Sequence, residues 1–213
     1  MPARRGRPPV HSRDAIVAAA SRALLERGLE GLRYADVSRA AHVPVASLRH
    51  YFPTIAELRI EGLRAMVRIE HEELAARLEG IDHPREQLDL IVVSTVRPDS
   101  SNGLEWLLWL DYYCAAARQP EIQADLRRSR ADFLRLFART IRSGIETGDF
   151  RVEGSVEDAA EELMAIVDGF GAHLAIPHHP ADDERYVALA VRGAHRLLGV
   201  RPCFAPPAPR QRP

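Results

Sequence analysis

The chain has 213 residues, of which 46% are hydrophobic and 28% are charged, which is enough for one large or two small domains with a buried core. No stretch approaches the roughly 18 consecutive apolar residues that a membrane helix needs, and the charged N-terminus has no apolar segment behind it. We therefore expect a cytoplasmic protein with no membrane partner. Cys114 and Cys203 lie far apart without metal-ligand spacing, which predicts free thiols in a reducing compartment.

The formal net charge of −1 hides an uneven distribution along the chain. Residues 1–58 hold nine Arg against five acidic residues, whereas the remainder holds twenty Arg against twenty-five acidic residues. A basic segment suits a polyanionic partner, because binding neutralises phosphates, and an acidic remainder is repelled by that partner. The N-terminal end is therefore the candidate binding end.

Residues 1–11 are rich in Arg, Pro and Gly and are predicted not to pack. They contain Arg5-Gly6-Arg7-Pro8, which resembles the core of the AT-hook, an extended arm that lays Arg into the narrow minor groove of A·T-rich DNA. On that resemblance Arg5 and Arg7 contact DNA. The alternative is a solvated tail.

Three short helices are predicted next. Ser12 supplies the cap of a helix that Gly28 ends. Apolar residues then recur at helical spacing from Tyr34 to Ala41 and from Val45 to Tyr51, with a break at residues 42–44. Two such helices around a tight turn form a helix-turn-helix, whose second helix lies in the major groove of DNA.

Residues 37–58 read V-S-R-A-A-H-V-P-V-A-S-L-R-H-Y-F-P-T-I-A-E-L, an order that resembles the TetR family of transcriptional repressors. The resemblance covers roughly the first 58 residues. The family usually has Gly where this chain has His42, Tyr where it has Arg49, and Lys where it has Ile55. His tolerates a left-handed turn better than most side chains, Arg can bind guanine through two hydrogen bonds, and Ile55 loses a phosphate contact.

The same resemblance implies which side chains meet DNA. It places one set at base edges and another at phosphates. The base-reading set is Val45, Ala46 and Arg49, and the phosphate set is Arg33, Ser47, His50 and Tyr51.

A longer helix is predicted to about Glu79, after the cap pattern Thr54-x-x-Glu57. It begins in the DNA-binding unit and ends in the rest of the chain, so we expect it to couple ligand and DNA. Glu70 falls on its apolar face. A carboxylate there is costly unless it has a partner, so Glu70 either lines a pocket or pairs with a neighbouring Arg.

Two further helices are predicted, one from Pro84 to Val96 and one over residues 106–114, W-L-L-W-L-D-Y-Y-C. Crowded aromatic rings near Glu105 and Asp111 are compatible with a cage for an organic cation. Their helical spacing favours an ordinary buried stripe over such a cage, and a general apolar pocket is a better alternative than the cage. The residues at this spacing are Trp106, Trp109, Leu110 and Tyr113.

An amphipathic helix is predicted from Pro120 to about Glu146, ended by Gly148. The passage Glu105-Trp106, Pro120, Gly144-x-x-x-Gly148-Asp149-Phe150 and Asp168-Gly169 resembles the C-terminal domain of the choline-responsive betaine-pathway repressors within the TetR family. This second resemblance concerns architecture more than ligand.

Two last helices are predicted, one capped by Ser155 and one starting near Asp182. Their heptad-like apolar spacing suits an intermolecular four-helix bundle, which the family resemblance favours, although both helices could simply close the monomer. The predicted interface residues are Leu163, Val167, Phe170, Leu174, Val187, Ala190, Ala194 and Leu197.

No catalytic constellation, phosphate-binding loop or nucleophile elbow is present, so we predict no enzyme activity, no catalytic residue and no cofactor. His173, His178 and His179 are the nearest approach to a metal site. The last two alternate with prolines in a predicted loop, so no metal ligand is assigned.

The prediction is an all-α protein of about nine helices, with a basic arm at 1–11, a helix-turn-helix domain at 12–57, a ligand-binding and dimerisation domain at 58–199 and a disordered Pro-rich tail at 200–213. It is a repressor that binds a near-palindromic double-stranded DNA operator as a homodimer and is released by a small-molecule effector. The alternatives are an activator of the same fold and a constitutive DNA binder. The predicted effector pocket contains Met66, Glu70, Trp106, Trp109, Leu110, Tyr113, Phe133, Phe137 and His173.

Overall fold

The computed structural model describes residues 12–97, 104–176 and 180–200. This part of the chain is all helical, as predicted. Its nine helices are α1 (Arg13–Gly31), α2 (Tyr34–Ala41), α3 (Val45–Tyr51), α4 (Ile55–Glu79), α5 (Pro84–Val96), α6 (Leu104–Ala116), α7 (Pro120–Thr147), α8 (Val156–Leu174) and α9 (Pro180–Leu197).

The helix starts follow the predicted caps. The side-chain oxygen of Ser12 accepts from the Ala15 amide at 3.1 Å, and that of Thr54 accepts from the Glu57 amide at 3.2 Å. Ser155 caps α8 in the same way. These contacts satisfy amides that the first turn of a helix leaves without partners, which is why helices begin there.

Three helices differ from the prediction at their ends. Helix α6 spans Leu104–Ala116, two residues more at each end than the predicted 106–114. Gly28 does not end α1. It interrupts the helix with φ 70° and ψ 169°, a conformation that glycine adopts without steric cost, and a short helical stretch follows to Gly31. The last helix begins at Pro180, two residues before the predicted start at Asp182.

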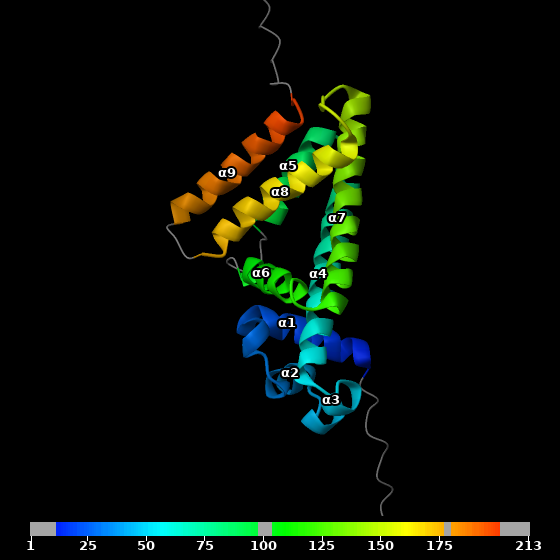
Figure 1. Ribbon diagram of the computed structural model, residues 1–213, viewed down its shortest axis with the longest axis vertical. Helices are drawn as coiled ribbons and strands as arrows, with labels where there is room; N and C mark the ends of the chain where they lie inside the picture. Colours follow the sequence, from blue (N-terminus) through cyan, green and yellow to red (C-terminus); the bar gives the residue numbers. More distant parts are fainter. Residues whose placement is uncertain (1–11, 98–103, 177–179, 201–213) are drawn as a thin grey trace, which may run out of the picture.

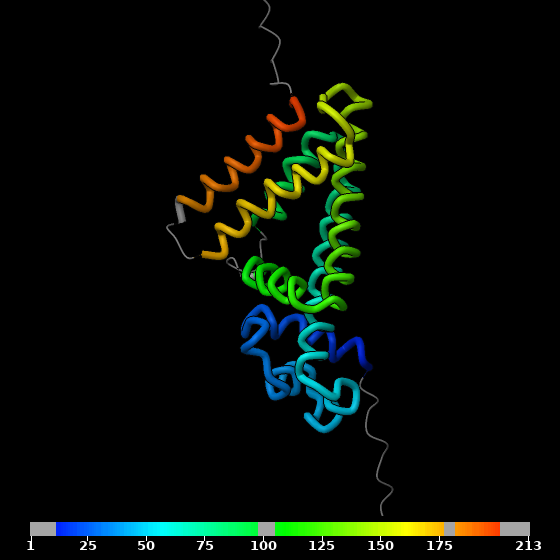
Figure 2. The backbone as a smooth tube through the Cα atoms, viewed as in Figure 1, coloured from blue at the N-terminus to red at the C-terminus, as the bar shows by residue number. Residues whose placement is uncertain are grey.

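The helices form two tiers (Figure 1). The lower tier consists of α1, α2 and α3, and the upper tier of α5 to α9. Helix α4 belongs to both. The tube in Figure 2 follows it from the recognition unit, which is formed by α1, α2 and α3, up alongside α7. Helix α6 lies directly on α1, so α4 and α6 both connect the tiers.

The antiparallel pair α8 and α9 packs its inner side on α5. The same pair lies at one flank of the molecule, with α9 outermost (Figure 1). This arrangement places a space between α4, α5, α6, α7 and α8, and it leaves the outer side of the pair uncovered by the described part of the chain.

Candidate functional sites: a recognition helix and an acidic pocket

The helix-turn-helix closes on a small apolar seam. Val37 of α2, Val43 of the turn and Leu48 of α3 are all at most 2% exposed. The turn is possible because His42 adopts the left-handed conformation, φ 54° and ψ 39°, as the sequence suggested it could. The Tyr34 hydroxyl donates to the Phe52 carbonyl at 2.7 Å and so joins the start of α2 to the end of α3.

The outer side of this unit carries the side chains predicted to meet DNA. Arg33, Ala46, Arg49 and His50 are exposed, whereas Val45, Ser47 and Tyr51 are half-buried. Arg5 and Arg7 lie outside the described residues. The guanidinium of Arg49 rests 5.3 Å from the centre of the Tyr34 ring, a cation–π contact that holds it at the surface beside α3.

A cavity of about 240 Å³ opens within the upper tier. It is smaller than the ~300–1,000 Å³ typical of sites for drug-sized ligands, so it suits a small molecule. Its walls combine carboxylates with aromatic and aliphatic side chains. They are Glu70, Glu73, Leu74, Arg77, Ser94, Thr95, Glu105, Trp106, Trp109, Tyr113, Leu126, Arg130, Phe133, Met164 and Asp168.

Five residues of the predicted pocket line this cavity: Glu70, Trp106, Trp109, Tyr113 and Phe133. The other four do not. Met66 and Phe137 are 4% and 0% exposed and belong to the core, and Leu110 packs against that core. His173 is exposed and stacks on Tyr186 of α9, with ring centroids 5.5 Å apart, so it faces away from the cavity.

Most of the polar residues that line the cavity were not predicted from the sequence. Glu73 and Arg77 come from the same helix as Glu70, Ser94 and Thr95 from α5, and Arg130 and Asp168 from α7 and α8. Charged residues on amphipathic helices are normally solvated, and only the packing of five helices turns these inward.

Glu70 is buried at the wall of the cavity. Its Oε2 accepts a hydrogen bond from the Trp109 indole N–H at 3.0 Å, whereas its Oε1 is buried without a hydrogen-bond partner. Burial, followed by the nearby charge of Glu105, raises the pKa of Glu70 to about 8. The partner is thus Trp109 and not the neighbouring Arg that one reading of the sequence proposed.

Across the cavity, Arg130 is already paired with two acidic residues. It contacts Glu161 at 2.6 Å and Asp168 at 3.3 Å, and the Tyr113 hydroxyl also bonds Asp168. Burial raises the pKa of Asp168, although Arg130 opposes that rise. The positive charge on this wall is therefore balanced by the protein itself.

Trp106 is held in place by close packing. Its indole N–H donates to the carbonyls of Thr95 and Val96, at 3.1 and 3.0 Å, and its ring lies against Gly171 of α8. A Cβ at Gly171 would overlap the ring far inside the 3.0 Å that real Cβ contacts respect. A glycine is required here because no other residue leaves room for the indole.

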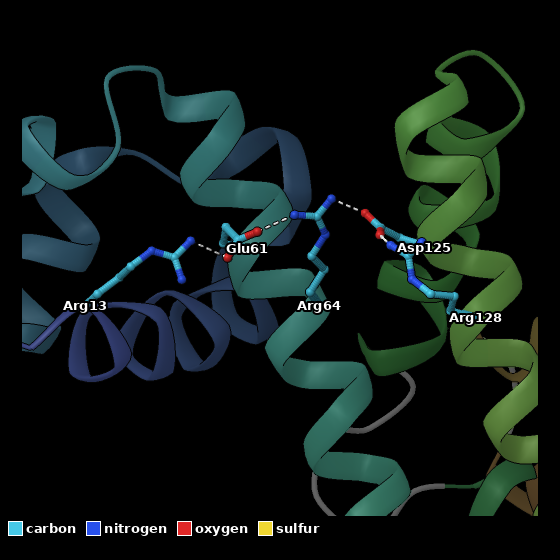
Figure 3. A network of polar contacts seen from close by, with 5 residues as sticks. All are labelled: Arg13, Glu61, Arg64, Asp125 and Arg128. Carbon is cyan, nitrogen blue, oxygen red and sulfur yellow. Dashed lines mark hydrogen bonds and ion pairs between the residues drawn. The ribbon is translucent and has the colours of Figure 1, made fainter.

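Two polar connections join the pocket tier to the recognition unit. The first is the chain of ion pairs in Figure 3, in which Arg13 of α1 contacts Glu61 at 2.6 Å and Glu61 pairs with Arg64, both of α4. Arg64 then pairs with Asp125 of α7, which also pairs with Arg128. The guanidinium of Arg13 in addition lies 5.0 Å from the Phe52 ring, next to the end of α3.

The second connection runs through α6. The carboxylate of Asp111 accepts a hydrogen bond from the backbone amide of Leu29, immediately after the interruption at Gly28. Helix α6 also supplies Glu105, Trp106, Trp109 and Tyr113 to the cavity. A displacement of α6 by a ligand would therefore act directly on the break in α1.

Four residues of the predicted dimer interface lie inside the monomer, so the prediction for them is wrong. Leu163, Val167, Ala190 and Ala194 are all 0% exposed. The heptad-like spacing did indicate a packed seam, but α8 and α9 use it to pack on each other and on α5. Phe170, Leu174, Val187 and Leu197 are half-buried.

Within the described ranges no group of three or more His, Cys, Asp or Glu side chains gathers in a way that could hold a metal ion. His178, His179 and Cys203 lie outside those ranges, and Cys114 is a free, exposed thiol. None of the helices described is long and apolar enough to cross a membrane.

A helix-turn-helix is joined here to a tier with an internal cavity, through the shared helix α4 and the contact of α6 with α1. This arrangement defines a class of protein: a transcriptional regulator with separate DNA-binding and ligand-binding parts. Comparison with known families agrees. Residues 16–61 match the bacterial regulatory proteins of the tetR family, and residues 84–199 match the C-terminal domain of BetI-type transcriptional repressors. The chain belongs to the TetR family, with a BetI-type C-terminal domain, and members of this family are regulators rather than enzymes.

Individual relatives support this assignment. The HTH-type transcriptional regulator BetI of Rhizobium meliloti (strain 1021) is 27% identical over 187 residues, covering 86% of this chain and 87% of that protein. PksA of Bacillus subtilis (strain 168) is 27% identical over 166 residues, covering 76% of this chain and 77% of its own length.

Solved structures share the fold. One is described as a transcriptional regulator from Saccharomonospora viridis in complex with choline, with a TM-score of 0.76 and 23% identity, covering 89% of this chain and 98% of that one. Another is reduced NemR of E. coli, with a TM-score of 0.71 and 17% identity, covering 88% of this chain and 97% of that one.

Proposed function

We propose that this protein is a homodimeric repressor that binds a near-palindromic operator and is released from it when a small molecule enters the cavity. The observation that carries the proposal is the physical continuity between the cavity and the recognition unit. The same helices, α4 and α6, line the cavity and contact α1. Because the proposed operator is DNA, we place the protein in the cytoplasm.

In this proposal α3 enters the major groove. Val45, Ala46 and Arg49 read bases, while Arg33, Ser47, His50 and Tyr51 meet phosphates. The exposure of Arg49 beside Tyr34 supports its role, because a guanidinium held at the surface can form two hydrogen bonds to guanine. Arg5 and Arg7 add a minor-groove contact.

The effector acts by favouring one position of α4 and α6. A ligand that fits the cavity in only one arrangement shifts the equilibrium between DNA-binding and released forms by its difference in affinity for the two. The ion pairs from Asp125 to Arg13 and the bond from Asp111 to Leu29 carry that shift to α1. A choline complex of a protein with this fold supports a small organic molecule as effector.

The dimer forms through the outer side of the α8 and α9 pair. That side carries small and apolar residues, with Ala165 and Gly169 exposed and Ile166, Phe170 and Gly193 half-buried. Small side chains allow a partner's helices to approach closely, and burying the half-exposed side chains of Ile166 and Phe170 supplies apolar area. This surface replaces the four buried residues of the sequence prediction.

Ala165→Arg tests the interface, since it places a charge on the exposed side of α8 without touching the core. We expect monomers with weak operator affinity by sedimentation and DNA titration. Leu163→Arg, in contrast, puts a charge into the monomer core and should prevent folding. A folded Ala165→Arg variant that stays dimeric would place the interface elsewhere.

The regulatory switch is tested by titrating ligand with and without operator, read by tryptophan fluorescence. Both tryptophans of the chain line the cavity, so binding reports directly. A coupling of ~1–3 kcal/mol weakens operator affinity ~5- to 150-fold, and operator must weaken ligand binding by the same factor. Equal ligand affinities under both conditions would indicate a constitutive binder, and an operator that strengthens ligand binding would indicate the reverse switch.

A further inference from the structure

The cavity wall formed by α4 and α6 contains an acceptor that lacks a donor. Of the two oxygens of Glu70, Oε2 is bonded to the Trp109 indole and Oε1 is buried with no hydrogen-bond partner. A buried acceptor without a donor is rare and costly in a folded protein. A cationic ligand that brings a donor to Oε1 would recover that cost, and it would favour the ionised form of Glu70, whose pKa burial raises to about 8.

Charge around this acceptor favours a positive ligand. Glu105, 5% exposed, comes from α6, and Glu73 from α4 itself, and both place negative charge near Glu70. Arg130 of α7 is paired with Glu161 and Asp168, and no arginine is among the groups that shift the pKa of Glu70. The remaining charged lining residue is Arg77 of α4, and α5 contributes only uncharged Ser94 and Thr95.

The aromatic lining does not form an open cage. Trp109 packs among other rings, with centroids 6.0 Å from Tyr112, 5.9 Å from Tyr113 and 6.1 Å from Phe133, and it turns its N–H edge to Glu70. The Trp106 ring packs closely against Gly171. Recognition of a quaternary ammonium ion depends on accessible ring faces, whereas the polar feature here is a carboxylate oxygen.

We propose that the pocket selects a small organic cation that carries at least one N–H, a protonated amine, and that this N–H donates to Oε1 of Glu70. The inference rests on the proposed function and specifies its effector. Charge-assisted hydrogen bonds are roughly twice as strong as neutral ones, so the N–H of a cation is the best donor for this site. A quaternary ammonium ion has the charge but no donor and leaves Oε1 unsatisfied.

Ser94 narrows the chemical class of the ligand further. Ser94 lines the cavity, and its hydroxyl oxygen is buried beside it without a hydrogen-bond partner. An amino alcohol supplies a cation for Glu70 and a hydroxyl for Ser94 within one small molecule. Amino alcohols are therefore suitable probes, because the hydroxyl stays constant while the nitrogen is varied.

The test compares four probes on the full chain at pH 7.5 by tryptophan fluorescence. Ethanolamine and N,N-dimethylethanolamine are cations with N–H groups, choline is their quaternary counterpart, and 3,3-dimethylbutan-1-ol is the uncharged carbon analogue of choline. N,N-dimethylethanolamine and choline differ by one methyl group. We expect the former to bind roughly tenfold or more tightly than choline, since an unsatisfied buried acceptor costs about that factor or more.

Two variants test whether Glu70 is responsible for this preference. Glu70→Gln should remove most of the preference for N,N-dimethylethanolamine over choline, because the charge at the acceptor is lost. Glu72→Gln is the matched control, since Glu72 is exposed on the same helix and pairs with Arg68 at 3.4 Å. It should leave the ranking unchanged.

Two outcomes would overturn the inference. Choline or the uncharged alcohol binding as tightly as N,N-dimethylethanolamine would show that N–H donation does not select the ligand. Failure of all four probes to bind protein that still binds its operator would exclude this ligand class, while leaving the proposed function as a DNA-binding regulator intact.

Discussion

Gly171→Ala is the sharpest probe of how the pocket is built. The added Cβ would occupy the space of the Trp106 ring, so the ring has to move. The ring cannot move freely, because its N–H is bonded to the carbonyls of Thr95 and Val96 at the end of α5. The substitution therefore forces either loss of these bonds or separation of α6 from α8.

The expected cost follows from three contributions. Overpacking a buried site costs ~1–3 kcal/mol, and the loss of the indole hydrogen bond adds ~0.5–1.5 kcal/mol. The better helix propensity of Ala offsets ~0.5–1 kcal/mol of this. The net destabilisation is ~0.5–4 kcal/mol, which for a chain of this size lowers Tm by roughly 1–16 °C.

Thermal unfolding and tryptophan emission measure the effect. Gly169→Ala is the control, since it makes the same change on the same helix at an exposed site where a Cβ meets nothing within 4 Å. Because Gly169 also lies on the proposed dimer surface, the two variants are compared where sedimentation finds the same oligomeric state, and there Gly169→Ala should be neutral or slightly stabilising. If Gly171→Ala unfolds no earlier than Gly169→Ala and its emission is unchanged, Trp106 does not occupy this space.

Three further outcomes are expected. Arg64→Gln breaks the ion pair between α4 and α7, so the ratio of ligand affinities with and without operator should move toward one. Arg68→Gln, on the exposed side of α4, is the control and should leave that ratio unchanged. Arg49→Ala should lose ~1–3 kcal/mol of discrimination between operator and random DNA, while Ser47→Ala should weaken both alike, and equal losses for Arg49→Ala would exclude base reading. Because the pKa of Glu70 is about 8, protons compete with a cation for its carboxylate below that pH. The affinity for N,N-dimethylethanolamine should therefore rise up to ~10-fold per pH unit from pH 6 and level off near pH 8. Glu70→Gln should abolish this trend, and its absence in the native protein would mean that Glu70 is not the acceptor.

The local elements of this protein were determined by the sequence itself. Caps at Ser12, Thr54 and Ser155, helical periodicity and the turn at His42 were all readable, because they depend on contacts between residues a few positions apart. The family followed from the same local order, since a helix-turn-helix is a local motif.

The tertiary structure decided which face of each helix meets which neighbour. Periodicity indicates that Leu163 and Ala190 are buried, but it does not say whether the same chain or a second copy covers them, and here the same chain does. In the same way Glu73 and Arg130 resemble ordinary solvated residues until five helices place them with Glu70 around one cavity. Burial and charge at that cavity arise from long-range packing, so only the folded chain defines them.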